Sequence, residues 1–288
     1  MKSNGIYGLM CGVAIAAAAV ATPSRAGAAE PVLRPVTSSW MLSAGTSHLV
    51  DTYLTPLKYD GWSVAVDYER SQAMKFDPER WTQRLTAALD FDSADNPARN
   101  ASMLYASLSA TWGMQSLFNL PWGIRAGVGP QARGDLGVLY NERNSNNPAS
   151  VKADVTVGAE GSLSYTVRLG RMPVTLRYQT SIPLTGVFFS PQYDELYYEI
   201  YLGNHAGLAH AAWWGNYFRW DNQITADLDF SATRLRVGFR SDLLSTRVSN
   251  ITSRVCTFAF IVGVTTDWFS IPRRQGLPAS DTSVIYAY

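Results

Sequence analysis

The sequence has little histidine, little cysteine and no excess of charge of either sign. It contains three histidines and two cysteines, and its 24 Lys and Arg residues face 23 Asp and Glu residues. A near-neutral chain lacks the basic surface that binds nucleic acid, so we exclude that partner. Because Cys11 lies in a segment expected to be removed, Cys256 stands alone, which excludes an internal disulfide and a cysteine metal cluster. We expect no metal site and no cofactor.

Long apolar runs are also missing beyond the N-terminal segment, which excludes a membrane-spanning helix there. The segment itself combines an early lysine, an apolar stretch from Gly8 to Ala21 and the small residues Ala26-Gly27-Ala28. This pattern predicts a secretory signal over residues 1–28, cut after Ala28 or Ala29, and a mature domain over residues 29–288. A secreted chain of this kind can still be a membrane protein if its strands close into a barrel.

What the sequence has in abundance is alternation with a period of two. From Val151 to Leu169, apolar or small residues occupy every odd position, while most of the even positions are polar or charged. Similar segments begin near Trp62, Leu85, Leu104, Trp122, Val174, Leu196, Ile224 and Leu235. We predict an all-β, antiparallel transmembrane barrel of about 12 strands, or of 10 if the region from Pro183 to Tyr217 is one loop. Val284, Tyr286 and Tyr288 are expected to form an alternating C-terminal strand that ends on an aromatic residue.

The two faces of these strands predict two different solvents. Val155, Val157, Leu163 and Tyr165 are expected to contact lipid, while the opposite parity carries charges of both signs and faces the lumen. Aromatic residues near strand ends predict an interfacial girdle; these are Trp40, Tyr59, Trp62, Trp81, Trp112, Trp122, Tyr140, Trp220 and Trp268. A soluble secreted β-sandwich or carrier barrel also alternates and stays open as an alternative.

The charged residues of the inner parity are expected to form ion pairs, because buried charges are costly unless they are paired. The segment from Arg234 to Arg240 should pair with Asp227 and Asp229 on the preceding strand, although a basic stripe that selects anionic solutes is the alternative. The expected lumen ion pairs involve Asp227, Asp229, Arg234, Arg236, Arg240, Glu160 and Arg168.

The histidines are the candidates for chemistry or ligand binding. An outer-membrane lipid hydrolase with a histidine base is the alternative function, but such barrels place a serine two residues after the histidine. Here Val50, Gly207 and Ala212 occupy those positions, so we expect no enzymatic activity. Cys256 is expected to face lipid without reacting. Aromatic residues beside two of the histidines predict a loop that binds a small molecule or glycan; the ligand candidates are His48, His205, His210, Trp213, Trp214 and Tyr217.

Two segments, "DTYLTPLKYDGW" from Asp51 and "FSPQYDELYYEIYLGNHAGLAH" from Phe189, resemble an uncharacterised family of Bacteroidetes outer-membrane barrel proteins, classed as a domain of unknown function. The resemblance implies a signal-bearing barrel in the outer membrane of a Gram-negative bacterium, with no assigned activity. The expected partners are outer-membrane lipid, the barrel assembly machinery and a small-molecule or glycan ligand. The expected role is structural, or the binding of a ligand or solute through the loops.

The outward parity of Val157 can be tested by charge. We expect Val157→Arg to destabilise the barrel by about 2–4 kcal/mol, the cost of an arginine on the lipid face near the bilayer midplane. Urea unfolding in phospholipid vesicles measures this cost. Insertion and stability equal to those of the parent would contradict a lipid-facing position.

Overall fold

The alternating segments form long strands. The computed structural model describes residues 32–145, 147–193, 195–203, 207–230, 233–268 and 283–288. The long strands are β2 (Val36–Asp51), β3 (Thr55–Ala73), β4 (Trp81–Asp95), β5 (Ser102–Asn119), β6 (Ile124–Asn141), β7 (Ala149–Leu169), β8 (Met172–Phe189), β10 (Tyr217–Asp229), β11 (Arg234–Val248) and β12 (Ile251–Trp268). The shorter elements are β1 (Val32–Leu33), η1 (Pro121–Gly123), α1 (Tyr197–Tyr201), β9 (Ala209–Ala212) and β13 (Ser283–Val284). The expected signal segment, residues 1–28, lies outside the described residues.

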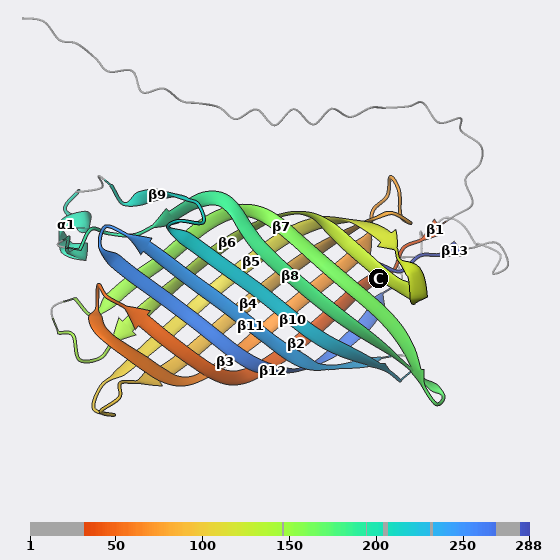
Figure 1. The fold of residues 1–288 in the computed structure, drawn as a ribbon, viewed down its shortest axis with the longest axis horizontal. Helices are drawn as coiled ribbons and strands as arrows, with labels where there is room; N and C mark the ends of the chain where they lie inside the picture. The colour runs from red at the N-terminus through yellow and green to blue at the C-terminus, as the bar shows by residue number, and fades with distance from the viewer. Residues whose placement is uncertain (1–31, 146, 194, 204–206, 231–232, 269–282) are drawn as a thin grey trace, which may run out of the picture.

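Ten antiparallel strands close into a barrel (Figure 1). Each long strand pairs with its neighbours in the chain, β8 pairs with β10, and β12 pairs with β2 over sixteen residues to close the sheet. Among the described residues, each long strand has a strand partner on both of its edges, which is the condition for a sheet in a solvent that offers no hydrogen bonds. The prediction of an all-β antiparallel barrel is confirmed.

The strand number is ten, so the estimate of about twelve is wrong and the lower alternative is confirmed. The difference arises after β8, where the alternating residues from Leu196 to Leu202 form the short helix α1 in place of a strand. Its first turn is fixed by Glu199, whose carboxylate accepts a hydrogen bond from the backbone N–H of Leu196 at 3.0 Å. Within the described residues, no helix is long and apolar enough to cross a membrane.

The C-terminal residues do not form a barrel strand. Only Ser283–Val284 pair, in parallel, with Val32–Leu33 of β1. The last strand of the barrel is β12, which ends at Trp268. The expectation of an alternating C-terminal strand is therefore wrong, because the backbone of Tyr286 and Tyr288 lies outside the barrel sheet.

The strands separate apolar from polar residues across the barrel wall. On β7, Val155 is 66% exposed and Val157 49%, whereas Asp154 and Glu160 are buried. Phe260 on β12, with 74% of its surface exposed, belongs to the same apolar outer face. Tyr59, expected in the outer girdle, is buried inside the barrel. Its parity differs from that of Trp62, which is exposed, and successive strand residues point to opposite faces.

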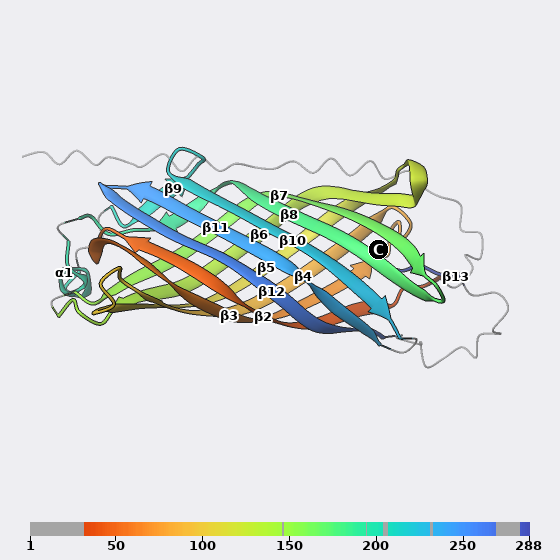
Figure 2. The same ribbon diagram turned by 60° about the horizontal axis from the view of Figure 1, so that its bottom comes forward.

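The two ends of the barrel differ. β1, β13 and the C-terminus lie at one end, which we name the terminal end, while α1 and β9 lie at the other, the α1 end (Figure 2). The chain between β8 and β10 gathers at the α1 end, where β9 pairs with residues 186–189 of β8. The remaining connections at that end are short, and the β11–β12 turn needs only Ser249 and Asn250.

The wall tolerates no side chain where β7 and β8 approach most closely. The pairing of these strands shifts register between Val157 and Gly158. A Cβ atom on Gly158 would lie 2.2 Å from the carbonyl oxygen of Ile182. We expect Gly158→Ala to lower the free energy of unfolding by about 1–3 kcal/mol, the usual cost of overpacking.

Urea unfolding in detergent micelles measures the cost of Gly158→Ala. Gly161→Ala is the matched control on the same strand, because its Cβ would meet nothing closer than 3.6 Å. Equal stability of the two variants would contradict the close approach.

Candidate functional site

The lumen is filled in three layers, the first of which is an apolar cluster at the α1 end. Its members are buried side chains that point inward from nine barrel strands, the β2–β3 turn and β9; they are Leu49, Leu54, Tyr59, Ala94, Met103, Tyr105, Leu139, Phe188, Ala212, Tyr217, Leu244 and Val255. The ring of Phe188 packs against that of Tyr217 with 5.5 Å between centroids. This cluster is the hydrophobic core of the protein, and it lies inside the barrel.

A polar cap ties the connections of the α1 end to this cluster. The buried carboxylate of Asp51 accepts hydrogen bonds from Ser150 and Ser253. It also forms an ion pair with Lys152 at 2.7 Å. Tyr53 donates a hydrogen bond to the carbonyl of Glu195 at 2.7 Å. The hydroxyl oxygen of Tyr197 accepts one from the N–H of Val151, and burial raises the pKa of Tyr197 to about 12. Tyr197 therefore stays neutral at physiological pH and serves as a fixed hydrogen-bonding group.

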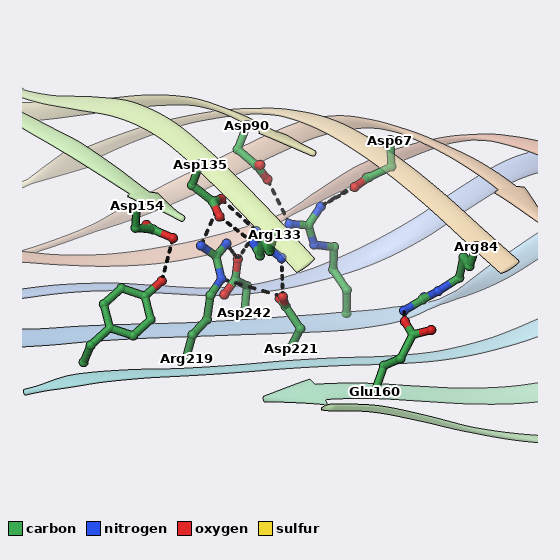
Figure 3. A network of polar contacts seen from close by, with 12 residues as sticks. Asp67, Arg84, Asp90, Arg133, Asp135, Asp154, Glu160, Arg219, Asp221 and Asp242 are labelled. Atoms are coloured by element: carbon green, nitrogen blue, oxygen red, sulfur yellow. Dashed lines mark hydrogen bonds and ion pairs between the residues drawn. The ribbon is translucent and has the colours of Figure 1, made fainter. Parts of the chain in front are cut away.

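The second layer is a network of arginines and carboxylates in the middle of the barrel (Figure 3). Arg133 forms ion pairs with Asp135 at 2.6 Å and with Asp221 at 2.5 Å. Arg219 lies 3.0 Å from Asp135 and also pairs with Asp242. The members come from β6, β10 and β11, so the network joins strands that do not all pair with one another.

A second group of the same layer centres on Glu69. Its carboxylate lies 3.0 Å from Arg177 of β8 and 3.0 Å from Arg236 of β11. Arg84 of β4 lies 3.7 Å from Glu69 and 2.5 Å from Glu160 of β7. These bonds connect strands on opposite sides of the lumen.

A cavity inside this layer has a volume of about 90 Å³. Asp67, Arg84 and Arg240 line it, together with Gln131 and Gln179, whose buried side-chain oxygens have no partner among the described residues. A single water needs about 10–15 Å³ of such space, so this cavity has room for several waters.

The third layer closes the terminal end with the C-terminal residue. The ring of Tyr288 lies over the guanidinium of Arg177, 3.9 Å from its centroid. Its hydroxyl accepts a hydrogen bond from Arg236 at 3.2 Å. Arg234 at the same end pairs with Asp267 at 2.7 Å.

The expected lumen residues have partners on several strands. Arg236 holds Asp227 through two bonds of 2.6 and 2.8 Å, and the two residues are direct partners on β11 and β10. Arg240 instead reaches across to Asp67 and Asp90 of β3 and β4. Asp229 lies half-buried at the end of β10. Arg168 is exposed near the β7–β8 turn and forms no ion pair within the described ranges.

The structure does not bring the ligand candidates together. His205 lies outside the described residues. His210 on β9 shares a hydrogen bond of 3.0 Å with the carbonyl of Ser190, and Trp213 is exposed beyond that strand. Trp214 donates to the carbonyl of Pro183 at 2.6 Å. Tyr217 points into the lumen, where its hydroxyl donates to Asp154 at 3.0 Å.

His48 lies apart from the other candidates, on the outer face of β2. Its Nδ1 lies 2.5 Å from Asp60 of β3, and the two are direct cross-strand partners. Cys256, half-buried on the outer parity of β12, faces His48 from the other side. Cys256, His48 and Asp60 thus lie in one row across three strands. The sequence did not predict this row, because strand parity does not give the register between β12 and β2. Among the described residues, no group of three or more His, Cys, Asp or Glu side chains is placed to hold a metal ion.

A closed antiparallel barrel with an apolar outer face and an ion-paired interior defines the outer-membrane type of β-barrel. The chain belongs to the family described as "Protein of unknown function (DUF3316)", whose model matches residues 9–275. The resemblance to an uncharacterised barrel family is confirmed in this respect. No curated protein matches the sequence.

Solved structures with a similar fold include outer-membrane barrels of several kinds. The outer membrane protease OmpT from Escherichia coli is 8% identical with a TM-score of 0.41, and the match covers 83% of this chain and 97% of that one. The β domain of the Bordetella autotransporter BrkA is 9% identical with a TM-score of 0.39, over 81% of this chain and 99% of that one. The toluene transporter TodX of Pseudomonas putida is 8% identical with a TM-score of 0.23, over 81% and 89%.

The ion pairs of the lumen predict a large effect of removing one buried partner. We expect Arg236→Met to lower the free energy of unfolding by about 3–5 kcal/mol, because Asp227 then stays buried without its bidentate partner. Arg168→Met is the matched control and should change it by less than about 0.5 kcal/mol, as is usual at exposed positions. Urea unfolding in detergent compares the two variants, and similar costs would contradict the assigned role of Arg236.

Proposed function

We propose that this protein is a closed outer-membrane barrel that does not conduct solutes, and that its role is carried by its outer wall and by the α1-end loops. The observation that carries the proposal is the filled lumen. The apolar cluster, the network of ion pairs and Tyr288 follow one another along the barrel axis, and the cavity in the ionic layer measures about 90 Å³. A solute channel would need these bonds to break.

The outer face supports location in a membrane. Leu42, Leu89, Val155 and Phe260 are all at least 60% exposed and lie on strands spread over the barrel wall. Monomeric soluble proteins rarely expose contiguous apolar surface of this extent. Lipid is therefore the first proposed partner, and the barrel assembly machinery that inserts such proteins is the second.

The α1 end supports a binding role for the loops. Tyr198 and Tyr201 of α1 are 67% and 84% exposed, and Trp213 beyond β9 is 61% exposed. Exposed aromatic rings stack on apolar or glycan surfaces at little entropic cost. We assign the α1 end to the cell exterior, since β1 and β13, the first and last strands that the structure describes, lie at the opposite end (Figure 1). A small molecule or glycan is the ligand class that these rings favour.

The closed lumen can be tested by conductance. Protein refolded into planar bilayers is expected to give no stable current steps, because charged side chains bridge the lumen. An open porin in the same bilayers is the positive control, and heat-modifiable gel mobility checks that the barrel has folded. Reproducible single-channel steps from the folded protein would contradict the proposal.

A further inference from the structure

One ion pair, between His48 and Asp60, lies on the outer face of the barrel and not in the lumen. The side chains of His48 and Asp60 are 51% and 68% exposed on the outside of the barrel. In every other ion pair among the described residues, both side chains are at most 26% exposed. The outer pair is three residues from the end of β2, where the apolar belt gives way to the α1 end.

The strand register places a thiol in the same row. Cys256 is the direct partner of His48 between β12 and β2, and His48 is the direct partner of Asp60 between β2 and β3. Cβ atoms of directly opposed residues lie about 4.5–5.5 Å apart. A nucleophile, an imidazole and a carboxylate thus stand side by side on one face. The neighbouring Ser47 does not belong to the row, because it points inward and donates to Asp92 at 2.6 Å.

The contact with Asp60 fixes the proton on His48. An ionised carboxylate only accepts hydrogen bonds, so Nδ1–H of His48 is the donor, and in the neutral imidazole Nε2 is left as an acceptor. Within the described residues, Nε2 has no hydrogen-bond partner. This is the arrangement of a general base that is oriented by a carboxylate and faces a nucleophile.

The surroundings of the row match the parts of an ester lipid. One step toward the α1 end, Arg254 and Lys58 flank Val50 on the same outer face, both exposed. This row lies about 6.6 Å along the strand, at roughly 3.3 Å per residue, and its two cations suit a phosphate. On the other side, toward the terminal end, the outer wall has a shallow apolar hollow that is open to its surroundings, lined by Leu42, Ala44, Val64, Leu89, Phe260 and Val262 among others. Such an apolar hollow suits an acyl chain.

We propose that Cys256, His48 and Asp60 form an acyl-transfer site on the outer wall, which removes an acyl chain from a phosphate-bearing ester lipid of the surrounding leaflet. The site rests on the membrane location proposed above. The phosphate lies at Arg254 and Lys58, the ester at Cys256 and His48, and the released chain in the hollow. The exposed His48–Asp60 pair is then part of a reaction centre that must face lipid.

The reaction balances with water as the second substrate. The Cys256 thiol gives its proton to Nε2 of His48, and the sulfur bonds to the ester carbonyl carbon. The ester C–O bond breaks, and the leaving alcohol of the lipid takes the proton from His48. Water then attacks the thioester and gives a proton to His48, the C–S bond breaks, and the sulfur takes that proton back. The products are a fatty acid and a lysolipid.

The test uses the full-length protein in vesicles of phosphatidylethanolamine and phosphatidylglycerol, with lipopolysaccharide in a second arm to distinguish the two lipid sources. We expect release of fatty acid, and an acyl adduct on Cys256 in the intact mass that hydroxylamine removes. Cys256→Ala should abolish the adduct, and His48→Asn should slow release at least about 100-fold, the usual range for a general base.

Further variants separate chemistry from folding. Asp60 is a positioning residue, so Asp60→Asn should lower kcat with KM unchanged and Asp60→Glu should restore part of it. The double variant Cys256→Ala, Val262→Cys keeps a thiol on the same strand and should stay inactive. Absence of the adduct and of fatty acid with both lipids, in folded wild-type protein, would overturn the proposal, as would activity that persists in Cys256→Ala. Neither result bears on the conductance of the lumen, so the proposal of a closed barrel is tested separately by the conductance measurement.

Discussion

The carboxylate of Glu69 holds guanidinium groups from three other strands, and the closed interior depends on bonds of this kind. Arg84, Arg177 and Arg236 reach it from β4, β8 and β11. A buried charge is tolerated only when it is paired, so each inward charge must find a partner within the barrel diameter. Ten strands bring opposite walls close enough for arginine side chains to span the lumen, and the lumen is filled as a result.

Much of the fold could be predicted, because apolar and polar residues alternate on each strand according to whether they face the outside or the lumen of the barrel. Val155 and Asp154 fall on the sides that their parity requires. The strand count could not be predicted, because the residues of α1 alternate as well as those of a strand, and the capping contact of Glu199 favours a helical turn instead. The C-terminal residues alternate too, but the side chain of Tyr288 lies over Arg177 and accepts a hydrogen bond from Arg236, contacts that the alternation does not reveal.

The candidate site was less predictable, because register decides which residues meet. Arg236 and Asp227 lie on consecutive strands and could be matched from the sequence, whereas Arg240 finds Asp67 and Asp90 across the lumen. The row of Cys256, His48 and Asp60 crosses the seam between the last and first strands of the barrel. Parity alone put Cys256 on the outer face, but only the closed register shows which residue stands opposite.

The position of Tyr288 has a consequence for the order of assembly. All strand pairings of the barrel are complete at Trp268, and the residue that closes the terminal end comes later in the chain. Tyr288 is therefore not a part of the barrel wall. Arg177 and Arg236 lie on β8 and β11, so the contacts of Tyr288 with both form only once these two strands are in place.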